Sequence, residues 1–162
     1  MTGRRPGNRK VRNLMAELSI ERDVLIEAPA DVVWRTLTEP DQLSQWFATR
    51  VDLVVEPGAR GYLQFGDQGG PVAVEAVEPP SRFSFRWNHK PGEEPVPGNS
   101  MLVEFTLTPE GPAQTRLRVT ESGHELTSWP AAEQQRYADE HTEGWGGFLG
   151  RLAVLAEKNF RE

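Results

Sequence analysis

The chain has 162 residues, no cysteine and a net charge of −6. This length suits a single domain, and the lack of cysteine excludes disulfides, thiolate nucleophiles and thiolate metal sites. Residues 1–15 contain five basic side chains and no acidic one, so the rest of the chain carries a net charge of −11. An acidic body repels a phosphate backbone, and we therefore expect no nucleic-acid partner.

Residues 1–19 are predicted to form a disordered basic leader, because they are rich in Gly, Asn and Arg and show no apolar periodicity. Met15 is an alternative start. No apolar run is long enough for the h-region of a signal peptide or for a membrane helix, which needs about 18 apolar residues. We therefore expect a cytoplasmic protein without a membrane span, in which residues 20–160 form one domain.

A strand and two short helices are predicted to open this domain. Polar and apolar residues alternate over residues 20–28, as in a strand with mixed faces. Helical spacing follows over residues 30–39 and again over residues 41–47, and Pro40 separates the two segments. Proline is tolerated in the first turn of a helix, because its missing N–H has no helical partner there. Trp46, in the second helix, is expected to anchor the core rather than to contact a ligand.

A run of about six strands comes next, indicated by apolar residues at every second position between turns rich in Gly and Pro. The clearest alternation places Phe83, Phe85, Trp87 and His89 on one face. The segment GDQGG at residues 66–70 predicts a hairpin turn, because it lacks the lysine and the strand–loop–helix context of a phosphate loop. The predicted strands span residues 50–56, 61–65, 72–78, 81–89, 101–107 and 115–122.

The last segment changes to the period of a helix. Residues 131–160 carry a stripe at spacings of four, three, four and three, formed by His141, Trp145, Phe148, Leu152 and Leu155. Glycines weaken the middle of this helix and allow a kink or a close approach to the sheet. Strands followed by one long helix predict an α+β fold in which the helix covers one face of the sheet.

Several of these stretches resemble one known superfamily. The segment Ile26–Trp34 (IEAPADVVW), with residues 37–40 and 45–47, resembles the opening of the SRPBCC/START-like (birch-pollen-allergen-like) superfamily. The resemblance is closest to the bacterial branch named for homology to the activator of a heat-shock-chaperone ATPase (AHSA), and it covers about residues 20–158. Segments similar to the family's central strands, last strand and last helix lie at residues 74–79, 82–87, 103–107, 115–123 and 144–152.

The resemblance implies a helix-grip fold. In this fold a curved antiparallel sheet of about six to seven strands, with two short helices after the first strand, packs against a long C-terminal helix and encloses a cavity. Members of the superfamily bind lipids, sterols, polyketides or hormones, a few are cyclases, and some confer resistance to natural products. The shared motifs are core and turn residues, so they indicate the fold more than the ligand.

The candidate site is the set of mainly apolar residues on the inward faces of the strands and of the last helix. A cavity with an apolar lining and a few polar groups is the usual form of a small-molecule site, although such rings can also fill a core completely. His141 is expected to point into the cavity near Glu143 or Tyr137, or to be a satisfied polar group of the core. The predicted ligand-binding residues are Phe65, Phe83, Phe85, Trp87, His89, Phe105, His141, Trp145, Phe148 and Leu152.

The sequence shows no reactive constellation. The three histidines, His89, His124 and His141, have no metal-motif spacing, and no serine or lysine has the neighbours of a nucleophile. We therefore predict no catalytic residue, no metal and no cofactor, and a monomer or weak homodimer that binds an apolar or aromatic small molecule such as a lipid or polyketide. Three alternatives stay open: a polyketide cyclase-like enzyme using the same cavity, natural-product self-resistance by sequestration, and a co-chaperone or protein-interaction module.

Overall fold

The computed structural model describes residues 19–87, 93–123 and 129–162. Residues 1–18 of the predicted leader, together with His89 and His124, lie outside the described residues. The described chain forms seven strands and three helices, in the order β1 (Ile20–Ile26), α2 (Ala30–Thr38), α3 (Pro40–Trp46), β2 (Arg50–Asp52), β3 (Arg60–Phe65), β4 (Gln68–Glu78), β5 (Arg82–Trp87), β6 (Met101–Gly111), β7 (Gln114–Gly123) and α5 (Ala131–Arg161).

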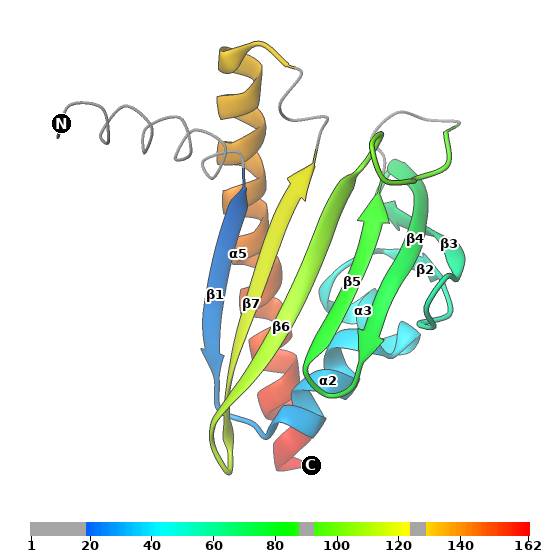
Figure 1. Cartoon of the computed structure of the whole chain (residues 1–162). Coiled ribbons are helices and arrows are strands. Elements are labelled where there is room, and N and C mark those ends of the chain that lie inside the picture. Colours follow the sequence, from blue (N-terminus) through cyan, green and yellow to red (C-terminus); the bar gives the residue numbers. More distant parts are fainter. Residues whose placement is uncertain (1–18, 88–92, 124–128) are drawn as a thin grey trace, which may run out of the picture.

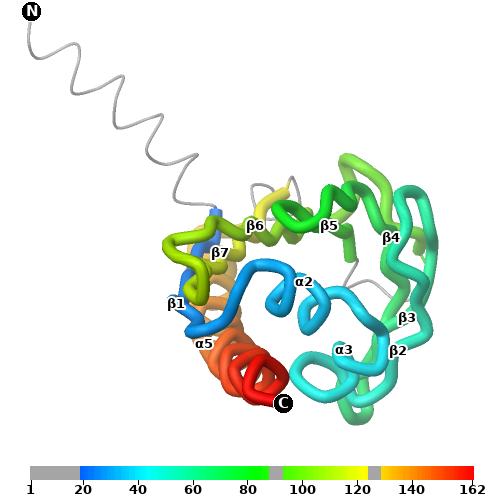
Figure 2. The backbone as a smooth tube through the Cα atoms, turned by 90° about the horizontal axis from the view of Figure 1, so that it is seen from below, coloured from blue at the N-terminus to red at the C-terminus, as the bar shows by residue number. Residues whose placement is uncertain are grey.

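The strands form one antiparallel sheet in the order β1-β7-β6-β5-β4-β3-β2. Figure 1 shows these strands side by side with α5 running along the β1 end. The view along the strands in Figure 2 shows the sheet curving around the helices. The predicted α+β helix-grip fold is thereby confirmed, with a seven-stranded curved sheet, two short helices after the first strand and a long C-terminal helix.

The strand expected over residues 50–56 is much shorter in the structure, where only Arg50–Asp52 pairs with β3. Backbone hydrogen bonds explain the difference. The N–H of Glu56 donates to the carbonyl of Val54, which closes a turn, and Gly58 then donates to Val74 of β4. The chain therefore leaves β3 after three residues, although its apolar alternation continues.

The predicted hairpin at the Gly-rich segment is confirmed, and β4 begins earlier than expected. Phe65 pairs with Gln68 across a two-residue turn whose first residue, Gly66, has a φ of 62°. Glycine is favoured there because a side chain strains the backbone at positive φ. Gly69 lies inside β4, where a Cβ atom would stand 2.8 Å from the carbonyl oxygen of Leu63. The glycines thus let β3 and β4 approach closely beside the site described below.

Helix α5 is a single helix of 31 residues, as predicted over residues 131–160. Its fully buried residues are Trp145, Leu149, Leu152 and Ala156, whereas His141, Phe148 and Leu155 of the predicted stripe are only partly buried. One glycine provides the expected close approach: a Cβ on Gly146 would lie 2.5 Å from the guanidinium of Arg22 in β1. That guanidinium donates to the carbonyl of Thr142 at 3.1 Å and fastens β1 to the helix.

Trp46 lies in the core, as predicted. Its side chain is 1% exposed, its indole N–H donates to the carbonyl of Thr36 at 2.9 Å, and its ring stacks on Phe47 with 4.9 Å between centroids. The ring of Phe105 meets Trp46 edge-on from the sheet. These contacts fix α3 to α2 and to the sheet.

Candidate functional site

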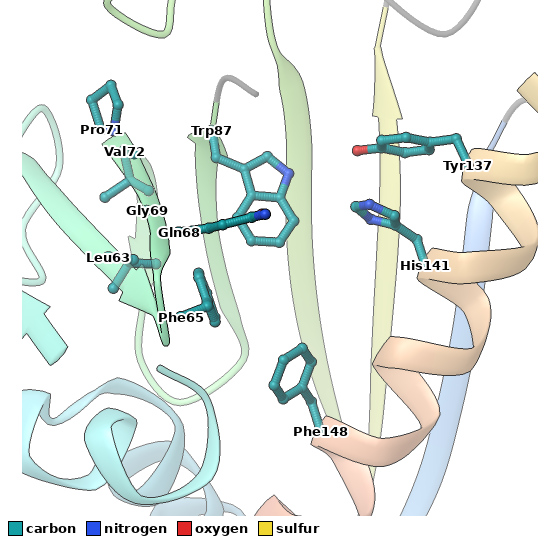
Figure 3. A pocket seen from close by; sticks show the side chains of 11 residues that line it. Leu63, Phe65, Gln68, Gly69, Pro71, Val72, Trp87, Tyr137, His141 and Phe148 are labelled. Atoms are coloured by element: carbon teal, nitrogen blue, oxygen red, sulfur yellow. The ribbon is translucent and has the colours of Figure 1, made fainter. Parts of the chain in front are cut away.

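A cavity of about 400 Å³ lies between strands β3, β4 and β5 and the segment of α5 that runs from Tyr137 to Phe148. Helix α5 packs mainly against β1, α2 and α3. Helix α5 is packed on β1, at one end of the curved sheet, and the strands β3, β4 and β5 lie farther from it. The cavity lies in the gap between these strands and α5 (Figure 3). It is lined by Leu63, Phe65, Gln68, Gly69, Gly70, Pro71, Val72, Trp87, Tyr137, His141 and Phe148.

The lower wall of the cavity consists of phenyl rings that support one another. Phe65 from β3 and Phe148 from α5 have their ring centroids 6.1 Å apart, and both labelled rings point into the same space in Figure 3. Phe47 packs edge-on behind each of them, at 5.1 Å from Phe65 and 4.9 Å from Phe148. Edge-to-face packing of this kind holds the rings in fixed orientations. The apolar wall is therefore formed before any ligand arrives.

The opposite wall carries three rings that also have polar atoms: Trp87, Tyr137 and His141. The rings of Tyr137 and His141, one turn apart on α5, stack at 3.8 Å. Trp87 of β5 meets the His141 ring edge-on at 6.1 Å. Figure 3 shows the three side chains converging from the sheet and from the helix. Their polar atoms are directed to one common partner.

That partner is Glu121 of β7, whose side chain is fully buried. Oε2 accepts hydrogen bonds from the indole of Trp87 at 2.9 Å and from the hydroxyl of Tyr137 at 2.5 Å. Oε1 lies 2.7 Å from Nδ1 of His141 and accepts from the indole of Trp145 at 2.9 Å. Each carboxylate oxygen thus has two donors, which is the condition for keeping a carboxylate away from water.

The surroundings of Glu121 favour its charged form. Burial by itself raises the pKa of this carboxyl group, but the hydrogen bond and the charge of His141, with hydrogen bonds from Tyr137 and Trp145, more than offset burial and leave the pKa below its ordinary value. The pKa of Tyr137 is raised strongly, first by burial and then by the adjacent Glu121. At neutral pH the hydroxyl group of Tyr137 therefore stays protonated and donates a hydrogen bond to the carboxylate.

The residues predicted to bind a ligand fall into two groups. Phe65, Trp87, His141 and Phe148 line the cavity. The other described members pack in the core with exposures of 0–2% and are not among the lining residues: Phe83, Phe85, Phe105, Trp145 and Leu152. Their rings and methyl groups belong to the hydrophobic core between the central strands and the helices. His89 lies outside the described residues.

Of the two neighbours suggested for His141, Tyr137 is confirmed and Glu143 is not. Glu143 is exposed to solvent on the other side of α5, and His141 pairs with Glu121 and stacks on Tyr137. The sequence contains a signal for Glu121: it continues the alternation of Leu117 and Val119, which are both fully buried. Extending that inward face by one more step would have placed a carboxylate inside the protein.

The lining also includes residues that sequence reasoning did not select, notably Gln68 and Tyr137. Gln68 begins β4 directly after the hairpin turn, and its amide extends across the cavity in Figure 3. Within residues 19–87, 93–123 and 129–162, no group of three or more His, Asp or Glu side chains could hold a metal ion. In the same ranges no helix has the length and apolar character needed to cross a membrane.

The family is decided by comparison with family models. The model described as Activator of Hsp90 ATPase homolog 1-like protein matches residues 27–157. The chain belongs to this family. A search of curated proteins gave no match. The AHSA-like resemblance seen in the sequence is thereby confirmed, and the match covers strands β2 to β7 and most of α5 but begins just after β1.

Solved structures of this fold agree with that assignment. Protein MLL2253 from Mesorhizobium loti is 27% identical, with a TM-score of 0.71, and the match covers 86% of this chain and 97% of that one. DynU16, a protein of the dynemicin biosynthetic locus, is 32% identical with a TM-score of 0.70, and the match covers 86% of this chain but 47% of DynU16. The Aha1 dimer from Colwellia psychrerythraea, at 21% identity, TM-score 0.69 and coverages of 86% and 96%, shows likeness in fold alone.

Proposed function

We propose that this protein binds an apolar or aromatic small molecule in the cavity between β3–β5 and α5. The observation that carries the proposal is a space of about 400 Å³ whose walls are rings fixed by their own packing. Ligand pockets commonly have volumes of about 300–1,000 Å³, a mostly apolar lining and a few polar groups. This cavity has that composition, and its polar members include His141, Tyr137 and Gln68.

Binding in this cavity has a simple driving force. Each Å² of apolar surface removed from water contributes about 25 cal/mol, and rings that are already in place lose little conformational entropy when a flat ligand stacks on them. The likeness to DynU16 supports a natural-product ligand, because that protein belongs to a biosynthetic locus. A lipid, a polyketide or another aromatic metabolite fits this description, and sequestration of a toxic compound is one use of such binding.

The test is a thermal and fluorescence titration of the purified protein with an anilinonaphthalene dye and with a panel of flat polyketides. A ligand of the folded state should quench tryptophan fluorescence and raise the melting temperature by mass action. Phe148→Ala removes one wall of the cavity and should weaken binding about tenfold. Phe160→Ala is the matched control, because Phe160 is 44% exposed near the end of the same helix and is not a lining residue. The proposal fails if no compound changes either signal.

A second candidate function is catalysis in the same cavity, as in a cyclase. One observation favours it: His141 lies on the cavity wall with a buried carboxylate behind it, and an imidazole supported in this way can act as a general base. The two functions differ in what is recovered. After overnight incubation, mass spectrometry of the bound compound distinguishes them. A compound that is recovered chemically unchanged supports binding, whereas conversion to a product supports an enzyme.

The oligomeric state, expected to be a monomer or weak homodimer, stays a prediction.

A further inference from the structure

Gln68 is the polar side chain among the lining residues of β3 and β4. Alternate residues of a strand share one face, so Gln68 lies on the same face of β4 as Gly70 and Val72. Val72 is 1% exposed, which identifies this face as the inner one. Gly70 has no side chain and leaves room beside Gln68. The strand therefore directs the amide of Gln68 into the cavity, as Figure 3 shows.

The methylene groups of Gln68 have a rigid neighbour. Phe65 pairs with Gln68 across the hairpin turn. Residues directly opposite each other on antiparallel strands share one face, with their Cβ atoms about 4.5–5.5 Å apart. The ring of Phe65 is itself held edge-on by Phe47, with 5.1 Å between centroids. The stem of Gln68 thus stands beside a fixed ring, which limits the directions that its amide can take.

The amide group of Gln68 has unused hydrogen-bonding capacity. Among residues 19–87, 93–123 and 129–162, none forms a hydrogen bond with this amide. On the opposite wall, by contrast, Trp87 and Tyr137 already donate to Oε2 of Glu121. A primary amide offers a carbonyl acceptor and an N–H₂ donor side by side. Gln68 is exposed to solvent, so a ligand can exchange with water for both of these groups.

The charge of the cavity restricts the polar group that this amide can recognise. Among the described lining residues none is Lys, Arg, Asp or Glu, and His141 already faces the carboxylate of Glu121. The chain outside residues 1–15 carries a net charge of −11, which disfavours an anionic ligand. A matching neutral group must place a donor beside an acceptor, as a lactam does. Glutamine recognises the adjacent donor and acceptor of adenine in this way.

We propose that Gln68 selects flat aromatic ligands that carry a lactam, or a similar neutral N–H beside a carbonyl, by forming two hydrogen bonds with that group. The inference rests on the proposed function, since it names the chemical class of the ligand of that same cavity. The ring system of the ligand lies between the strands and α5, against Leu63 and Val72 on one side and Tyr137 on the other. Its lactam edge faces Gln68.

Isothermal titration calorimetry with two probes of nearly equal shape tests this selection. 2-Quinolinone has a lactam N–H beside its carbonyl, and N-methyl-2-quinolinone has the same rings and carbonyl without that hydrogen. Gln68→Met keeps the length of the side chain and removes the amide. The ratio of the affinity for 2-quinolinone to that for the N-methyl compound should be about fivefold higher in the wild type than in Gln68→Met, the size expected for one net hydrogen bond. Comparing the two ratios cancels the contribution of the extra methyl group itself.

Gln135→Met is the matched control. Gln135 is exposed on α5, its amide donates to Asp139 at 2.8 Å, and it is not a lining residue. The same chemical change at this position should leave the affinity ratio at the wild-type value. A ratio that falls equally in both variants overturns the inference, because the effect would then not come from the cavity.

The outcomes separate this inference from the proposed function. Equal ratios in the wild type and in Gln68→Met, with both probes bound, overturn the role of Gln68 while the cavity remains a binding site. If neither probe binds the wild type, the inference fails, and the dye and polyketide titration decides whether the proposed function fails with it. A second measurement needs no variant: the side-chain amide resonances of Gln68 should shift on saturation with 2-quinolinone. Unmoved Gln68 resonances at saturation overturn the inference.

Discussion

Two regions of the space between sheet and helix contain aromatic rings, and only one of them is filled. Around the central strands the rings of Phe83 and Phe105 stack at 6.0 Å, and Trp145 of α5 meets Phe105 at 5.7 Å. Toward β3 and β4, Phe65 and Phe148 face a cavity. The residue types are the same in the two regions. The curvature of the sheet and the position of α5 on β1 decide which rings form core and which form a wall.

The largest expected difference between the regions is in stability. Trp46→Ala, in the filled region, should lower the free energy of unfolding by about 3–5 kcal/mol, because it removes a fully packed ring and leaves a hole. Phe65→Ala, beside the existing cavity, should cost about 2 kcal/mol or less, since one side of that ring has few neighbours to lose. Urea denaturation measures both values. Equal costs would show that the cavity wall is packed as tightly as the core.

The next effect concerns the buried carboxylate. Glu121→Gln keeps the shape but places an amide N–H₂ against the two donors of one of the two oxygens, and a donor left without an acceptor costs about 1–3 kcal/mol. Glu21→Gln on β1 is the matched control, because its carboxylate is 53% exposed and pairs with Arg118 at 3.5 Å. That change should stay within about 0.5 kcal/mol. If both variants unfold at the same urea concentration, the Glu121 cluster does not stabilise the fold.

The contribution of Glu121 should also depend on pH. Its pKa is lower in the folded protein than in the unfolded chain, where a glutamic acid has a pKa of about 4.3. The stabilisation is therefore fully present above about pH 4.3 and is lost as the pH falls through the folded pKa. The stability difference between wild type and Glu121→Gln should shrink on acidification from pH 5 to pH 3. A difference that grows over this range would mean that burial dominates and the pKa is raised.

The smallest effects are expected on α5. Gly150→Ala should stabilise the protein by up to about 1 kcal/mol, because alanine favours a helix and no atom lies within 4 Å of the new Cβ. Gly146→Ala should gain less, since its Cβ must displace the guanidinium of Arg22. Thermal unfolding of the two variants measures the difference. A larger gain at Gly146 would show that the contact between Arg22 and the helix contributes nothing.

The fold was predictable because its pattern is local. Alternation over single strands, the turn at Gly66 and the helical period of residues 131–160 each depend on neighbours in the sequence. The length of β2 was not predictable in this way. Its apolar residues continue to alternate after Asp52, but its backbone hydrogen bonds depend on where β4 lies.

The site was harder to predict because its polar centre joins distant segments. Glu121 receives hydrogen bonds from Trp87, 34 residues before it, and from His141, 20 residues after it. Local pattern indicates that His141 faces inward, but it does not indicate which carboxylate supports it. The division of the aromatic residues into core and wall likewise follows from the global curvature of the sheet.

The central claim is that ligands bind at the wall and not in the filled region. Chemical-shift mapping of the wild-type protein during titration with 2-methoxynaphthalene tests it most directly. The account predicts that shifts concentrate on the side chains of Phe65, Trp87, His141 and Phe148 and leave Phe83 unchanged. Shifts that centre on Phe83 and spare these four residues, or no shift at saturating probe, would contradict it.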